Sequence, residues 1–351
     1  MTAYVMLLAV PLLLQHTRIR GISYRRRNEM ALFLFFAWLT VLVALRHETV
    51  GKDTAVYARY FTRWARLDWQ SLRRVEMEPG FVLLNKLISF FSDEPQVLLA
   101  VSAALVSAMI YPTYRRLCVD ASLTILLFCT MSTFFMLFSG IRQMLAVGLG
   151  FAAYECTRRK RWGLFLLTVV GAMVFHTSAF MLLFMYSAYH ARISGKWLAA
   201  LVPVYVLRKP AFSMLAAVLE RFTGYEAEIT STGAYTMLIL FALFAVFTYV
   251  IPDEGELDEE TRGMRNFLLL ALLVQMFAPL HMLAMRMNYY YIIFIPLLLP
   301  RVISARRGRW NKVALLARHI MVLFFLVYFF FSGFRGGNLN FLPYHFFWET
   351  V

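Results

Sequence analysis

Apolar runs of about 20 residues recur along the chain, separated by short polar or basic segments. A helix of about 20 apolar residues spans the hydrocarbon core of a bilayer. We therefore predict an all-α polytopic integral membrane protein with about 10–12 transmembrane helices. The expected spans lie near 2–15, 29–45, 95–112, 121–138, 141–157, 162–175, 178–190, 197–207, 234–252, 266–285, 288–303 and 313–332.

The composition supports a membrane protein, and this class of protein explains the large positive net charge. The chain is 61% hydrophobic and only 16% charged, against roughly 25% charged residues in soluble domains. Its net charge of +15 fits loops that collect Lys and Arg on the cytoplasmic side and meet anionic lipids. We expect membrane lipids as partners and no nucleic acid, because no compact basic domain is present. The three cysteines lie in or beside spans without a CxxC pair and read as apolar residues.

Basic clusters set the orientation of the spans. Alternating spans place clusters such as 25–27, 158–161 and 301–309 on one side, which we assign to the cytoplasm. The N-terminal apolar stretch precedes its arginines, unlike a secretory signal, so we expect an uncleaved first span. The single transmembrane domain, 1–351, then carries an outer loop at 46–80, a second outer loop at 208–233 and an acidic cytoplasmic loop at 252–265.

Three segments differ from ordinary spans. Residues 53–70 place Tyr57 and other aromatics on one helical face and several arginines on the opposite face. This pattern predicts an amphipathic helix on the outer membrane surface, with its aromatics toward the lipid. Residues 210–222 resemble a second such helix. The segment 80–91 is too short to span, so we expect it to be interfacial or re-entrant.

Arginines at the outer ends of spans are the first candidates for chemistry. Arg46 follows a span, Arg142 and Gln143 begin one after a tight turn, and Arg286 stands between two spans. Arginine near the membrane is costly unless it meets water, a partner or an anion, and its planar fork recognises phosphate. Snorkelling toward the interface is the alternative for Arg142. Tyr290 and its neighbours could form an aromatic belt or stack on sugars.

His176 lies at the turn between two unusually short apolar stretches. Non-helical backbone at membrane depth is tolerated beside water-filled cavities, so we expect His176 at a cavity floor, as a general base or as a structural histidine. Asp53 is a second candidate base, with a helix N-cap as the alternative. Glu78 precedes Pro79-Gly80, and a single acidic residue there is only weak evidence for a functional site. The familiar motifs HExxH, Walker A, GxGxxG and GxSxG are absent from the sequence.

Taken in order, these short elements resemble the EpsG family, a branch of the Wzy-type bacterial polysaccharide polymerases. Each element is short, and their joint order carries the resemblance. One departure is Gly140, where a polar residue such as Asn is expected. The matching residues are Arg46, Gly51, Asp53, Thr54, Tyr57, Glu78-Pro79-Gly80-Phe81, Asn85, Ile141-Arg142-Gln143, Phe175-His176, Ser178-Ala179, Arg286 with the following tyrosines, and Pro343-Tyr344.

The resemblance implies a GT-C-like glycosyltransferase architecture in the bacterial cytoplasmic membrane, with the active site facing the periplasm or exterior. The substrate would be an oligosaccharide repeat unit linked to undecaprenyl pyrophosphate, and a chain-length regulator would be an additional partner. We expect no cofactor or metal, because arginines can stabilise the diphosphate; Asp53, Glu78 and His176 as metal ligands are the alternative. The expected catalytic residues are His176, Asp53 and Arg142, and the expected substrate-binding residues are Arg46, Arg286, Tyr57, Glu78, Gln143, Tyr290 and Tyr344.

Two other functions would use similar basic residues. An O-antigen ligase-like glycosyltransferase typically has a large outer loop late in the chain, whereas only 208–233 is of notable length here. A non-enzymatic flippase or transporter of a lipid-linked glycan should show internal repeats, and the sequence shows none. Both considerations favour the polymerase.

Overall fold

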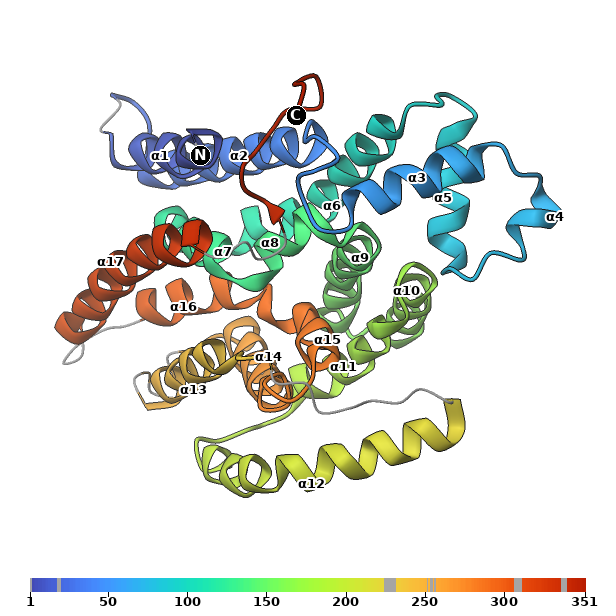
Figure 1. The fold of residues 1–351 in the computed structure, drawn as a ribbon. Helices are drawn as coiled ribbons and strands as arrows, with labels where there is room; N and C mark the ends of the chain where they lie inside the picture. The colour runs from blue at the N-terminus through green and yellow to red at the C-terminus, as the bar shows by residue number, and fades with distance from the viewer. Residues whose placement is uncertain are drawn as a thin grey trace. The chain divides into compact units, whose positions relative to one another are not determined.

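The computed structural model describes residues 2–17, 20–223, 232–250, 252, 255, 257–305, 311–335 and 340–351. Within these residues the chain is helical and forms no strand longer than an isolated bridge, which confirms the all-α class (Figure 1). Contacts divide it into two compact units, which are described separately. Unit 1 contains Met1–Leu183 and Leu316–Val351, and unit 2 contains Phe184–Leu315.

Unit 1 holds the N-terminal helices and most of α17. Its core packs α2 against α1 and α6, and α9 against α6 and α10. Its helices are α1 (Thr2–His16), α2 (Tyr24–Ala44), α3 (Thr54–Ala65), α4 (Trp69–Leu72), α5 (Pro79–Ser89), α6 (Pro95–Leu117), α7 (Ala121–Thr130), α8 (Ser132–Ser139), α9 (Ile141–Arg158), α10 (Trp162–Phe175), the 3₁₀ helix η1 (Thr177–Leu182) and α17 (Asn311–Arg335), which begins in unit 2.

Unit 2 is built around α14, which packs against α13, α15 and α16. Asn288 on α15 fixes one of these contacts by donating to the carbonyl oxygen of Ala271 at 2.9 Å and to Gln275 Oε1 at 3.0 Å. Its helices are α11 (Leu183–His190), which begins at the unit boundary, α12 (Trp197–Thr223), α13 (Tyr235–Val250), α14 (Glu259–Gln275), α15 (Met282–Ile292) and α16 (Ile295–Ser304).

Several described helices are long and apolar enough to cross a membrane, so this is a multi-pass membrane protein. Four qualify alone: α2, α6, Trp197–Ala217 within α12 and Lys312–Phe331 within α17. Two bent pairs raise the number to six, α7 with α8 at 62° and α15 with α16 at 46°. Three shorter apolar helices, α1, α10 and α13, also match expected spans. The total of 10–12 stays a prediction.

The structure differs from the sequence interpretation in unit 2. A single helix, α12, covers both the short span expected at 197–207 and the surface helix expected at 210–222. The outer loop expected at 208–233 therefore begins inside a helix, and residues 224–231 lie outside the described part. The acidic segment 252–265 also becomes helical at Glu259, because Asp258 caps α14 by accepting from the Thr261 amide at 2.8 Å.

The aromatic face of α3 packs on protein instead of lipid. Tyr57, Phe61 and Trp64 are buried, and the Phe81 ring on α5 makes edge contacts with Tyr57 at 5.3 Å and Trp64 at 6.1 Å between centroids. The helix is amphipathic as expected, but its apolar side is used to dock α3 on α5 and α6 (Figure 1). Hydropathy cannot distinguish these two environments, because both bury the same aromatic area.

Candidate functional site

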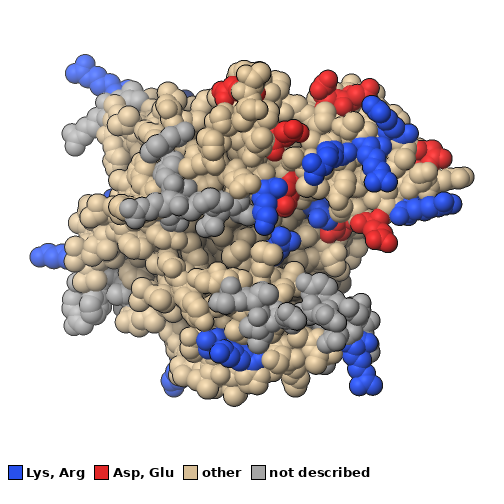
Figure 2. All heavy atoms as spheres, viewed as in Figure 1, with Lys and Arg blue, Asp and Glu red and all other residues tan. Residues whose placement is uncertain are grey.

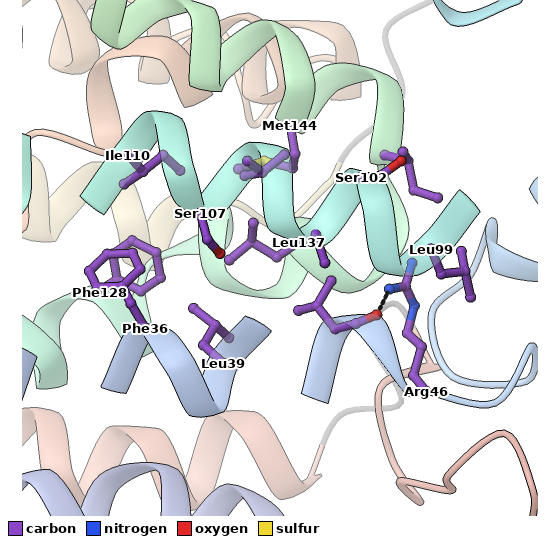
Figure 3. Close-up of a pocket in the computed structure, with 14 residues that line it drawn as sticks. Phe36, Leu39, Arg46, Leu99, Ser102, Ser107, Ile110, Phe128, Leu137 and Met144 are labelled. Carbon is purple, nitrogen blue, oxygen red and sulfur yellow. Dashed lines mark hydrogen bonds between the residues drawn. The ribbon is translucent and has the colours of Figure 1, made fainter. Parts of the chain in front are cut away.

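Arg46 is completely buried just beyond the end of α2. Its Nη1 donates to the Val43 carbonyl oxygen and its Nε to Thr54 Oγ1 at 3.3 Å, while Nη2 has no hydrogen-bond partner among the described residues. Burial lowers the pKa of this guanidinium to about 10, against opposing effects of nearby tyrosine hydroxyls. The adjoining cavity, bounded by Leu99 and Ser102 of α6, measures about 20 Å³, enough for water but not for a pyrophosphate (Figure 3). Arg46 thus ties the end of α2 to the following loop.

A C-terminal segment closes over the same loop. An isolated antiparallel bridge joins Arg46 and Phe346, and the Gly51 amide donates to the Asn340 carbonyl oxygen at 2.8 Å. The Tyr344 hydroxyl, predicted to bind substrate, donates to the Leu42 carbonyl oxygen at 2.9 Å. Burial raises the pKa of Tyr344, against the lowering effect of Arg46. Tyr344 therefore lies with Arg46 in this loop-closing cluster.

The loop after Arg46 docks on the end of α8. Gly51 has a φ of +94°, and an added Cβ would lie 1.8 Å from the Phe138 carbonyl oxygen, so only glycine fits. The Lys52 amide donates to Ser139 Oγ at 2.6 Å. Asp53 occupies the N-cap position of α3 but makes no side-chain capping bond. This docking fixes the start of α3 beside the turn that leads into α9.

Glu78, Arg142 and His176 meet in unit 1, although they are far apart in sequence. Glu78 Oε2 accepts from Arg142 Nη1, and Glu78 Oε1 lies 2.9 Å from His176 Nδ1. The three side chains are part-buried, with exposed fractions of 14%, 24% and 17% respectively. We call this set the carboxylate cluster. Glu78, the weakest of the three candidates in the sequence, is the residue that joins the other two.

Close helix packing brings this cluster together. Glu78 is the N-cap residue of α5, and His176 ends α10 and precedes η1. At Gly80, an added Cβ would lie 2.8 Å from a side-chain carbon of Val174 and 2.9 Å from its carbonyl oxygen. The missing side chain lets the first turn of α5 approach the last turn of α10. Gly80 is thus a positioning residue. It is one of the residues that resemble the family, but the sequence did not indicate a role for it.

The proton positions in the cluster follow from charge. Burial would raise the pKa of Glu78, but the hydrogen bond from His176 and the charge of Arg142 outweigh it and lower the pKa to about 2. The carboxylate is therefore ionised at neutral pH and can only accept hydrogen bonds. His176 Nδ1 must then donate, which in the neutral ring leaves the lone pair on Nε2.

Tyr57 and Gln143 extend the cluster along α3 and α9. The Arg142 guanidinium carbon lies 6.0 Å from the centroid of the Tyr57 ring, and the two side chains also interact by hydrogen bonding. Gln143 is buried, and its Nε2 lies 3.4 Å from Ser178 Oγ in η1. Ser178 is among the residues that resemble the family, but the sequence did not indicate it as a site residue. Its position two residues after His176 was the signal that could have placed it in the site.

The remaining candidates have other surroundings. Arg286 and Tyr290 belong to α15 of unit 2, where Tyr290 is buried. At Gly140, where the chain departs from the family pattern, an added Cβ would lie 2.1 Å from the Met136 side chain.

Among the residues that the structure describes, no group of three or more His, Cys, Asp or Glu side chains is placed to hold a metal ion. Asp53, Glu78 and His176 therefore do not form a ligand set here.

The fold and the carboxylate cluster together define a multi-pass, all-α membrane protein with a part-buried carboxylate–histidine–arginine site. The comparisons with known proteins give its family. A profile of the EpsG family matches residues 29–346, nearly the whole chain, and the chain belongs to this family of Wzy-like polysaccharide polymerases. No curated protein and no solved structure matches it.

Proposed function

We propose that this protein polymerises lipid-linked oligosaccharide repeat units at the outer face of the bacterial cytoplasmic membrane. Family membership supports a polysaccharide polymerase in general, and the observation that supports the chemistry is the carboxylate shared by His176 and Arg142. The donor would be a glycan on undecaprenyl pyrophosphate. Its transfer needs a base for the acceptor hydroxyl and a cation for the departing diphosphate, and the carboxylate cluster holds one of each.

In the proposed step, an acceptor sugar hydroxyl attacks the anomeric carbon of the donor. The new glycosidic bond forms as the bond from that carbon to the diphosphate oxygen breaks. His176 Nε2 takes the hydroxyl proton, and Glu78 stabilises the resulting imidazolium through Nδ1. The bonding electrons leave with the diphosphate, whose added negative charge Arg142 stabilises. No cofactor enters this scheme.

Arg142 is suited to the diphosphate because Glu78 does not use all of its donors. One terminal nitrogen binds the carboxylate and the guanidinium also hydrogen-bonds with Tyr57, while 24% of the side chain remains exposed. A guanidinium carries five N–H donors in a planar fork. It can therefore hold Glu78 and a phosphate oxygen together, which would couple donor binding to the orientation of His176.

Reconstitution separates this proposal from its alternatives. The purified protein in liposomes, given a polyprenyl diphosphate-linked oligosaccharide, should release polyprenyl diphosphate and form a ladder of multiples of the repeat unit. Transfer of the glycan only to a different acceptor would favour a ligase. That alternative is less supported, since residues 208–223 of the expected late loop belong to helix α12. Translocation across the bilayer without a new glycosidic bond would favour a flippase.

The proposed orientation has an independent test, motivated by the basic clusters. Cysteines introduced at positions 27 and 160 should be shielded from an impermeant thiol reagent in intact cells, and a cysteine at position 70 should be labelled. Permeabilised cells provide the control, because all three positions should then react. The reverse pattern in intact cells would place the carboxylate cluster on the cytoplasmic side and contradict the proposed site.

A further inference from the structure

The face of α3 opposite its packed aromatics, together with the C-cap residue Arg66, carries three arginines in one row. Arg59, Arg63 and Arg66 follow at spacings of four and three residues, so they project from the same side of the helix. All three side chains are exposed, and they line one hollow of about 500 Å³ together with Glu48, Ala58, Thr62 and Pro95. Figure 2 shows Lys and Arg side chains gathered over the α3–α5 part of this face. We call this hollow the arginine groove.

The positive charge of the arginine groove is not neutralised within the described chain. None of its three guanidinium groups forms an ion pair with a described carboxylate, although Glu48 lines the same hollow. Like charges one turn apart destabilise a helix. Such an arrangement becomes favourable when an anion binds across the row, since arginine recognises carboxylate and phosphate by paired hydrogen bonds.

We propose that the arginine groove binds an acidic glycan, with its arginines holding the sugar carboxylates. The inference rests on the proposed function only in taking a glycan as the substrate. A hollow of this size is in the range of small-molecule sites, about 300–1,000 Å³. Glu48 and Thr62 add oxygen acceptors that suit sugar hydroxyls. The groove thus combines cations for the acid group with acceptors for the hydroxyls.

A membrane surface is a less suitable occupant. A helix that lies on lipid must place its apolar face in the bilayer, but the apolar face of α3 is buried by α5 and α6. The same helix presents Tyr57 to Arg142 on its packed side. Since a helix with side chains is only about 10–12 Å across, a glycan in the groove would lie one helix away from the carboxylate cluster. The groove could therefore hold part of the glycan during transfer.

Binding to short oligogalacturonates tests the proposal. The full-length protein in phosphatidylcholine nanodiscs should bind these acidic oligomers, less tightly as salt is raised, and should not bind neutral maltooligosaccharides of equal length. The Arg59→Gln/Arg63→Gln variant should bind at least about tenfold more weakly, because it loses charged hydrogen bonds to the sugar carboxylates. The matched control is Arg73→Gln/Arg74→Gln, which removes the same charge from exposed positions outside the groove and should bind like the unmodified protein.

Three results would overturn the proposal: no binding of oligogalacturonate, equal losses in the two double variants, or a loss in Arg59→Gln/Arg63→Gln that appears only with phosphatidylglycerol vesicles. The last result would identify lipid headgroups as the occupant. The binding assay needs no turnover. A protein without polymerase activity can therefore still bind the acidic oligomers, and failure of the proposed function is distinguishable from failure of this proposal. A His176→Ala protein should bind the acidic oligomers as tightly as the unmodified protein, whatever its polymerase activity.

Discussion

Replacing His176 by alanine is expected to lower the rate of polymer formation by about 10²–10⁴-fold, the usual contribution of one general base. Donor binding should survive, because Arg142 and Glu78 remain paired. Turnover of the lipid-linked donor in liposomes, with donor binding measured separately, checks both parts. The low pKa of Glu78, about 2, adds a pH test: this carboxylate stays ionised until the pH falls toward 2, so activity lost at milder acidity reports another group.

His176→Gln is the matched control, since glutamine can hydrogen-bond to Glu78 but is not basic. It should be as inactive as the alanine variant. Near-normal activity in the glutamine variant would show that His176 serves only hydrogen bonding or packing. Asp53 would then become the leading candidate base, because its carboxylate makes no capping bond at the start of α3. Loss of turnover in Asp53→Asn, measured in the same assay, would then support Asp53 as the base.

Replacing Arg142 by alanine is expected to abolish detectable polymer, a loss of about 10²–10³-fold or more for one group that stabilises developing charge. Arg142→Lys should restore activity only partly, because lysine keeps the charge but loses the planar fork of donors. Gel analysis of polymer, normalised to the amount of inserted protein, measures the effect. Arg286→Ala, in unit 2, should lose polymer in the same assay if Arg286 also binds the pyrophosphate, as the sequence predicts.

Arg142→Ala also leaves Glu78 without its charged partner, so destabilisation must be separated from lost chemistry. The double variant Arg142→Gln/Glu78→Gln removes both charges and keeps a hydrogen-bonding pair. It should unfold at nearly the same temperature as the unmodified protein and still make no polymer. Full activity in Arg142→Ala would contradict the diphosphate role and leave snorkelling as the explanation.

Sequence patterns located most helices because membrane spans depend on local apolarity. Helices α6, α9 and α10 begin at the predicted residues 95, 141 and 162. Local patterns failed where the surroundings decide. The aromatics of α3 are equally suited to lipid or protein, and the prolines of α12 did not break a helix that the sequence divided. Proline interrupts one backbone hydrogen bond, and neighbouring groups can replace it in a membrane helix.

The sequence could indicate individual candidate residues of the site, but it could not show how their side chains are arranged in space. Arginine and histidine beside predicted spans carry a cost that makes them visible in the sequence, and for this reason the sequence indicates Arg142 and His176 as candidates. Their common partner was not visible, because the contact of Glu78 with them depends on helix packing at Gly80. Arg46 shows the converse. Its position at the end of a span predicts a ligand contact, and the sequence did not show that its donors bond the Val43 carbonyl oxygen in the last turn of α2 and Thr54.

The pairing of residues 340–347 with the loop after α2 also bears on synthesis. The His47 amide donates to the His345 carbonyl oxygen at 2.8 Å, and the Phe347 amide donates to the Leu45 carbonyl oxygen at 2.9 Å. These partners are translated about 300 residues apart, so the first loop cannot close while the ribosome is still building the intervening helices. A nascent chain that has not yet reached residue 340 lacks these contacts, so the loop that leads into α3 is still without its C-terminal partners.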